Sequence, residues 1–191
     1  MKAGENLSWI DLIREFNPYN EQERNDKEAS LKYISIFDDI LKRDNEIVHI
    51  TCSGFVINKN KDKVLMVNHN IFQSWSLPGG HTDGDEDLIA VAISEISEET
   101  GVKDINLVTD KIVSLDILPV MGHFRKGKYI TPHLHVSVVY LFQADENEQV
   151  IIKPDENSGV KWIPINEIDI YSNESHMQKI YSKIISKIKN L

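Results

Sequence analysis

Hydrophobic and polar positions divide the chain into an N-terminal helical part and a longer part rich in strands. Residues 1–44 follow a helical period, with a short amphipathic piece and then a longer helix predicted at 21–42. β-branched apolar segments begin near residue 46, and the strands that they predict alternate with loops and two further helices. Strands are predicted at 47–57, 63–68, 75–77, one or two within 105–118, 130–143, 150–152 and 160–163, with loops at 119–128 and 154–158.

This order predicts an α/β sandwich around a mixed β-sheet, with an N-terminal helical extension at 1–44 and the main domain at 45–191. The longer N-terminal helix has one apolar face, which is expected to pack on the main domain; a homodimer contact or a cap over the substrate is the alternative. The C-terminal helix, predicted at 175–189, is expected to pack through its apolar face and to expose its lysines. Binding of that basic face to an anionic membrane is the alternative.

One stretch in the middle of the chain holds seven acidic residues and no lysine or arginine. Asp83, followed three residues later by Glu86, is typical of a capping box and predicts a helix over 85–100. Glu95, Glu98 and Glu99 then fall on one face of its last turns, where they repel one another and the negative end of the helix dipole. A hard divalent cation such as Mg²⁺ or Mn²⁺ would relieve this repulsion, whereas a solvated acidic face is the simpler reading.

The spacing of the acidic residues favours the metal. Gly80 is followed after five residues by Glu86 and, after seven more, by residues 94–102, which read SEISEETGV. This pattern resembles the signature of the Nudix hydrolases at every specified position except Ser94, where that family has arginine. The resemblance implies a mixed sheet between helices. It also implies Mg²⁺-dependent hydrolysis of a diphosphate linkage, typically in a nucleoside diphosphate joined to another group.

The resemblance also implies roles for individual residues. The carbonyl of Gly80 and the carboxylates of Glu95, Glu98 and Glu99 match the metal ligands of the family, and Glu86 is a structural residue of the signature. Glu95 is the candidate within the signature for a base or a residue that orients water. In many members a carboxylate in a distal loop has that role, and Glu156 is the residue expected here. An ordinary loop acid is the alternative reading of Glu156.

Ser94 is the one departure from the signature. Arginine at this position would hold a glutamate of the signature through charge-assisted hydrogen bonds, whereas serine can make one weak local bond. Either a lysine or arginine from elsewhere supplies the charge, or catalysis is weakened, or the protein only binds its ligand and is regulatory. An active enzyme is the working hypothesis.

Histidines and one arginine are the candidates for substrate binding. His133 and His135 are two apart on a predicted strand and therefore share a face, and His81 follows the glycine pair. They are expected to form a polar pocket wall near the phosphates, with a packed structural role as one alternative. A histidine-rich metal site, as in the isopentenyl diphosphate isomerases of the same fold, is the other, but their cysteine is absent near 76–81. Arg125 lies in a loop of cations and aromatics that could clamp phosphate or could simply be solvated.

Composition sets the remaining limits. The net charge of −9 argues against a nucleic-acid partner, and the single cysteine, Cys52, excludes an intrachain disulfide. No apolar run is long enough to span a bilayer, and no signal peptide is evident. The sequence therefore predicts a cytoplasmic protein that acts on a small-molecule diphosphate without a membrane partner.

Overall fold

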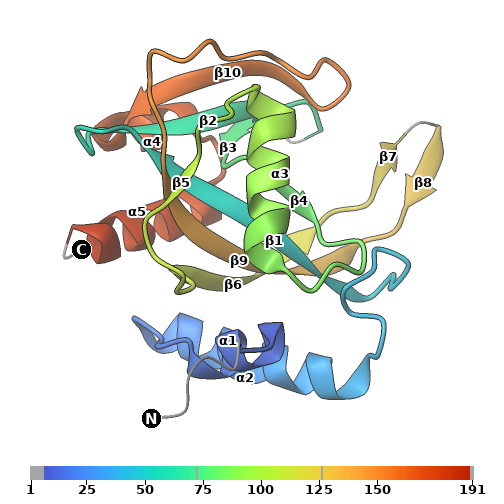
Figure 1. The fold of residues 1–191 in the computed structure, drawn as a ribbon. Helices are drawn as coiled ribbons and strands as arrows, with labels where there is room; N and C mark the ends of the chain where they lie inside the picture. The colour runs from blue at the N-terminus through green and yellow to red at the C-terminus, as the bar shows by residue number, and fades with distance from the viewer. Residues whose placement is uncertain (1–6, 72, 126, 190–191) are drawn as a thin grey trace.

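The computed structural model describes residues 7–71, 73–125 and 127–189 (Figure 1). Its elements are α1 (Trp9–Glu15), α2 (Glu21–Ile36), β1 (Val48–Ile57), β2 (Lys63–His69), β3 (Ser74–Ser76), β4 (Gly79–His81), α3 (Leu88–Thr100), β5 (Asn106–Leu107), β6 (Ser114–Val120), β7 (His123–Arg125), β8 (Lys128–Ile130), β9 (His133–Gln143), β10 (Asn157–Pro164), a 3₁₀ turn at Ile165–Glu167, α4 (Ile168–Tyr171) and α5 (Ser175–Ile188).

A mixed sheet of eight strands forms the centre of the fold. Its main path runs β10-β2-β1-β9-β5, while β3 pairs with β2, β4 with β1 and β6 with β9. The long pair β1 and β9 is parallel, with His49 opposite His135 and Thr51 opposite Ser137, and the other pairs are antiparallel. β7 and β8 form a separate hairpin.

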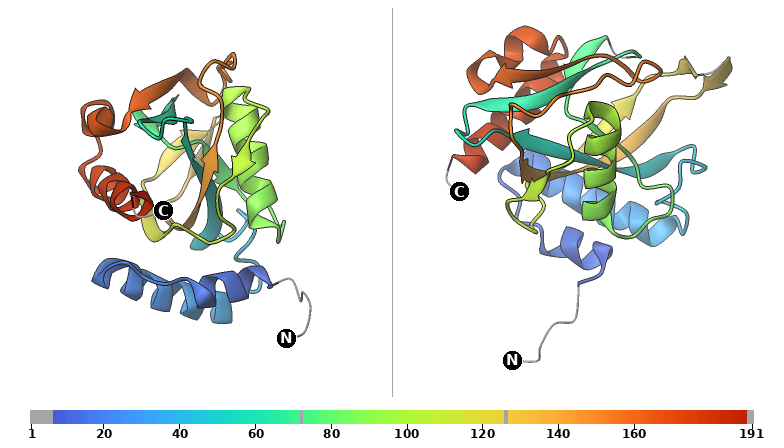
Figure 2. Two further views of the ribbon diagram at one scale, coloured as in Figure 1. Left: turned by 60° about the vertical axis from the view of Figure 1, so that its left-hand side comes forward. Right: turned by 45° about the horizontal axis from the view of Figure 1, so that its top comes forward.

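Helices cover both faces of the sheet, as Figure 2 shows with α3 and α5 on opposite sides. One core lies under α3 and includes Ile96, Tyr140 and Phe142, and the other lies under α5 and includes Phe55 and Tyr181. Each core buries apolar side chains from one face of the sheet, which is the main stabilisation of such a layered fold. The α/β sandwich predicted from the sequence is confirmed.

The N-terminal extension shares the first of these cores. Trp9, Ile13 and Phe16 from α1 and its end are buried with the residues beneath α3. α2 lies against β6. The extension therefore packs on the rest of the protein, while the domain boundary at residue 44 and a homodimer contact stay predictions.

A buried ion cluster fastens the extension to the C-terminal helix, and it corrects one expectation about that helix. Lys183 was expected to be solvated with the other lysines of α5, but it is buried. Its ammonium lies 3.0 Å from the carboxylate of Glu23 on α2 and also pairs with Asp116 on β6. Lys187 contacts Glu23 at 3.1 Å. Because the two carboxylates are buried, they need these cations, and the lysines are drawn inward.

Two of the predicted helices in the first hundred residues are shorter than expected. α2 ends at Ile36 because the chain turns to bury Ile40, whose carbonyl accepts from Ile50 of β1 at 2.9 Å. α3 begins at Leu88, with Asp87 as the N-cap that accepts from the amide of Ala90. The capping box expected at Asp83 and Glu86 is therefore wrong.

Asp83 instead has a positive φ of 49° and binds Arg43 from the chain before β1. The side chain of Glu86 is exposed. At the other end, Gly101 has a φ of +79° and ends α3 in the left-handed conformation expected of glycine.

Two other segments differ from expectation. The predicted loop 119–128 contains β7 and the start of its hairpin partner β8. The predicted strand 150–152 does not form; Ile151 donates its amide to the carbonyl of Thr100 at 2.7 Å and packs as a loop against the end of α3. Ile151 and Ile152 remain exposed, so their β-branched composition alone does not produce a strand.

Within the described ranges, no helix combines the length and the apolar character needed to cross a membrane.

Candidate active site

A cavity of about 630 Å³ opens beside the glycine pair; β1, β4, β9, the β7–β8 hairpin and α5 line it, and α3 contributes Glu95 and Glu99. Most of the residues that the sequence singled out line it. They are Gly80, His81, Glu95, Glu99, Arg125, His133, His135 and Glu156. The cavity therefore gathers residues from both halves of the chain at one site.

Two glutamates of α3 lie against the glycine pair. The carboxylate of Glu99 accepts from the amide of Gly79 at 2.9 Å. The carboxylate of Glu95 lies over Gly80 so closely that a Cβ atom there would come within 2.4 Å of its oxygen. A side chain at position 80 would displace the Glu95 carboxylate, so glycine preserves an arrangement in which two carboxylates and a backbone segment lie side by side.

Burial makes these carboxylates unusual acids. Loss of solvent raises the pKa of Glu95 to about 7, and the neighbouring charges of Glu98 and Glu156 add to the shift. Burial likewise raises the pKa of Glu99 to about 7, against the opposing effect of the Gly79 amide. A bound cation would offset the cost of ionising these two crowded carboxylates. Their hard oxygen atoms suit Mg²⁺ or Mn²⁺.

Glu98, the third glutamate, lies on an exposed part of α3 and is held by two neighbours. It accepts from the hydroxyl of Ser94 at 3.0 Å and from the ammonium of Lys153 at 3.2 Å. These two hydrogen bonds lower its pKa, with that from Lys153 the larger cause. Lys153 also pairs with Glu156 at 3.0 Å. The cation missing at position 94 is thus supplied by a lysine from a distant loop.

Lys153 lies on the same loop as Glu156, and its ammonium links that loop to the signature helix α3. One ammonium contacts a carboxylate from each, so it fixes Glu156 relative to α3. Glu156 lines the cavity, and so does Arg43 from the segment before β1. Arg125 lies on β7 at the cavity wall. Lys126, next to Arg125, lies outside the described residues.

Four histidines gather on the floor of the cavity. His133 and His135 share a face of β9, as predicted, and His81 on β4 comes beside them. The ring centroids of His81 and His135 are 5.1 Å apart, and those of His133 and His135 are 5.0 Å apart. His49 on β1 completes the group, with its ring 4.8–4.9 Å from each of the other three.

Three of these imidazoles, those of His49, His81 and His135, are held neutral. Burial lowers the pKa of His81 to about 3 and that of His135 to about 2, and positive charge on their neighbours would lower both further. Burial also lowers the pKa of His49. At neutral pH these three histidines therefore present lone pairs and N–H groups rather than positive charge.

Sequence reasoning missed three residues of this site: Arg43, His49 and Lys153. A period-two pattern of polar residues in the apolar strand β1, at His49, Thr51 and Ser53, was the available signal for the histidine. No local pattern marks the other two, because their partners lie on distant segments.

Comparison with known proteins agrees with the fold. The family model described as NUDIX domain matches residues 47–184. The chain belongs to the Nudix family.

Individual relatives are more distant. An RNA pyrophosphohydrolase of Pelagibacter ubique is 25% identical over 143 residues, which cover 72% of this chain and 90% of that protein. An RNA pyrophosphohydrolase of Brucella anthropi is 28% identical over 127 residues, which cover 62% and 72% of the two chains. The match to the family and these relatives confirm the predicted class of enzyme, a Nudix pyrophosphohydrolase.

A solved structure supports the fold alone. The Ap4A hydrolase of C. elegans in a binary complex superposes with a TM-score of 0.55 at 18% identity, covering 74% of this chain and 98% of that one.

Proposed function

We propose that the protein hydrolyses a diphosphate linkage in a nucleoside-diphosphate-type substrate, with Mg²⁺ or Mn²⁺ held by the Gly80 carbonyl and by Glu95, Glu98 and Glu99. The observation that carries this proposal is the packing of Glu95 and Glu99 against the glycine pair inside the cavity. Carboxylates crowded in this way cost stability unless a cation joins them. The donor set fits the metal, because it consists of hard oxygen atoms.

A bound divalent cation would neutralise charge on the phosphate oxygens as water attacks phosphorus. The protein's own part is to place the acids and to accept a proton from that water. Glu156 and Glu95 both line the cavity and are the two candidates for the acceptor. Lys153 positions Glu156 and Glu98 together, so the family's arginine is replaced here by a lysine acting on the same group of acids.

The substrate is expected to lie along the histidine floor. His81 can donate an N–H bond to a phosphate oxygen without bringing charge, His133 and His135 form the polar wall beside it, and Arg125 can pair with a phosphate. Exposed Phe124 and Tyr129 on the hairpin beside Arg125 offer rings on which a base could stack.

A second candidate substrate is a triphosphorylated 5′ end of RNA. The names of the relatives favour it, and the aromatic hairpin with its cations could hold the first nucleotides. The overall net charge of −9 disfavours a long polyanion, so the small-molecule diphosphate is preferred.

The test is a phosphate-release screen over nucleoside diphosphate conjugates and a 5′-triphosphorylated RNA, each with Mg²⁺ and with Mn²⁺. Hydrolysis that is abolished in Glu99→Gln and retained in Glu86→Gln, a neutralised acid on the exposed side of the same signature, is the expected result. Activity unaffected by Glu99→Gln would overturn the assignment of the site. No hydrolysis by the wild type or by Ser94→Arg would favour the alternative of a regulatory protein that only binds its ligand.

A further inference from the structure

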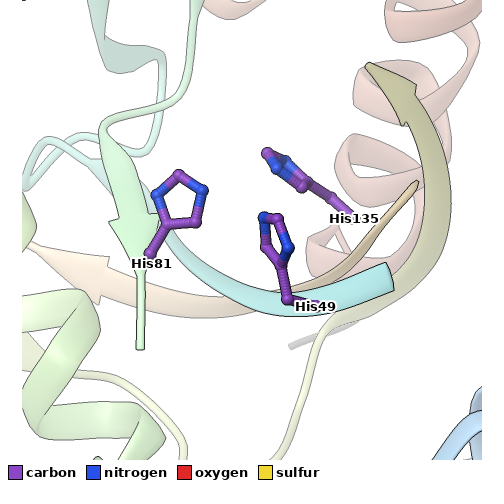
Figure 3. Close-up of side chains that lie close together, drawn as sticks. All are labelled: His49, His81 and His135. Carbon is purple, nitrogen blue, oxygen red and sulfur yellow. The ribbon is translucent and has the colours of Figure 1, made fainter. Parts of the chain in front are cut away.

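We infer that His49, His81 and His135 form a second metal site, which binds a d-block divalent cation such as Zn²⁺ and is separate from the carboxylate site. Each ring offers one of its two nitrogens as a ligand atom, and the three ligand atoms lie within 4.8 Å of one another. Figure 3 shows the rings turned toward a common space from three strands, β1, β4 and β9. This site does not depend on the proposed hydrolysis.

The register of the sheet brings these side chains together. His49 lies directly opposite His135 in the parallel pair of β1 and β9. His81 on β4 is opposite Thr51, which is two residues along β1 from His49 and therefore on the same face. Because all three positions belong to paired strands, the backbone holds the ligands in place before any metal binds.

The separation suits coordination after small movements. Zinc–nitrogen bonds of about 2.1 Å in a tetrahedron place ligand nitrogens about 3.4 Å apart. Rotation of the rings by about 1 Å at their tips would close the present gap. Three imidazoles leave a fourth position, which would face the cavity and accept water or an oxygen of a ligand.

The hydrogen bonding of His49 gives the strongest indication that a metal ion binds here. Its Nδ1 lies 2.9 Å from the carbonyl oxygen of Asn45, and because a carbonyl only accepts, Nδ1 bears the proton. Nε2 therefore holds a lone pair, and this buried atom has no hydrogen-bond partner among the described residues. A ring anchored through one nitrogen to a backbone carbonyl, with the other nitrogen free, is the arrangement typical of metal-binding histidines.

His133 orients His135, one of the three proposed metal ligands. Its Nδ1 lies 2.8 Å from the carbonyl of Thr131, so its Nε2 accepts from Nε2 of His135 at 3.2 Å. This leaves Nδ1 of His135 with a lone pair for a metal.

The donor atoms decide the type of cation. Imidazole nitrogen is a borderline-soft ligand that selects Zn²⁺, Co²⁺ or Ni²⁺ over Mg²⁺, whereas the oxygens of Glu95 and Glu99 select Mg²⁺ or Mn²⁺. One cavity therefore offers two sets of donors with opposite preferences.

The experiment is titration of the chelator-treated full chain with Co²⁺, followed by the visible d–d absorption of four- or five-coordinate cobalt, in competition with Zn²⁺. One equivalent is expected to bind and to be displaced by Zn²⁺ but not by Mg²⁺. His135→Gln, which removes a partly exposed ligand, should weaken binding by at least about 100-fold, the upper range for loss of a residue that only orients a ligand. His49→Gln should do the same, with circular dichroism to check that it folds.

Two control variants test whether the cobalt spectrum comes from these three histidines. His176→Gln removes an exposed imidazole outside the cluster and should leave the cobalt spectrum unchanged. Glu99→Gln should also leave it unchanged, although the proposed hydrolysis is lost. The inference is overturned if the wild type gives no such spectrum, if His135→Gln and a folded His49→Gln bind cobalt as the wild type does, or if Glu99→Gln abolishes the spectrum.

Discussion

Neutralising Glu99 should stabilise the metal-free protein at alkaline pH even though it removes a residue of the active site. The side chain is 4% exposed, lies beside Glu95 and takes its hydrogen bond from the Gly79 amide. Glu99→Gln preserves the shape and the oxygen that accepts this bond. It removes only the charge that burial disfavours.

The magnitude follows from the pKa of Glu99, which is raised from its ordinary value of 4.5 to about 7. Because the folded state binds the proton more tightly, the contribution of this group to stability is complete below pH 4.5. It is lost as pH rises through 7. For these two values, the free energy of unfolding falls by about 1 kcal/mol by pH 5.5 and by about 3 kcal/mol by pH 8. Glu99→Gln escapes this loss, so its advantage over the wild type should grow by about 2 kcal/mol between the two pH values.

Urea unfolding of both proteins at pH 5.5 and pH 8, in the presence of a chelator, measures this difference. Glu86→Gln neutralises an exposed acid of the same segment and should track the wild type at both pH values. Excess Mg²⁺ should reverse the order at pH 8, since only the wild type gains from the cation. The reasoning is refuted if metal-free Glu99→Gln is no more stable relative to the wild type at pH 8 than at pH 5.5.

Three other variants or treatments test other parts of the structure. Lys153→Met should lower kcat/KM by about 10–100-fold in steady-state hydrolysis, as expected for a residue that positions active-site acids. Adding Ser94→Arg should restore part of the lost kcat/KM. If Ser94→Arg restores none of it, this role of Lys153 is contradicted. Lys183→Met should cost about 3–5 kcal/mol in urea unfolding because it leaves buried carboxylates short of a cation. Lys179→Met, on the exposed face of α5, should change stability by under about 0.5 kcal/mol, and equal effects would count against the ion cluster. Burial raises the pKa of the Cys52 thiol, so a disulfide reagent should label the native protein no faster than it unfolds.

The sequence was most informative where a local pattern has a single structural meaning. Strand periodicity located β1 and β9, and the spacing between Gly80 and Glu99 identified the loop and helix that hold the acids. The start of that helix was misplaced because two aspartates compete for the cap. Asp87 is the N-cap of the helix, whereas Asp83 pairs with Arg43.

Features that depend on distant partners could not be predicted. Lys153 replaces the charge missing at Ser94, yet 59 positions separate them in the chain. Lys183 looked like a solvated lysine because the two buried acids that bind it belong to α2 and β6. His49 joined the histidine cluster only through its register with His135. In each case, tertiary contacts outweighed the local preference of the residue.

The buried carboxylate of Glu23 constrains the order in which the protein can fold during synthesis. Its partners Lys183 and Lys187 lie about 160 residues further along the chain, so translation at about 5–20 residues per second delays them by about 8–32 s. During that interval α2 cannot bury this acid with its matched cations. The helical extension is therefore expected to dock only after the later α5 has emerged.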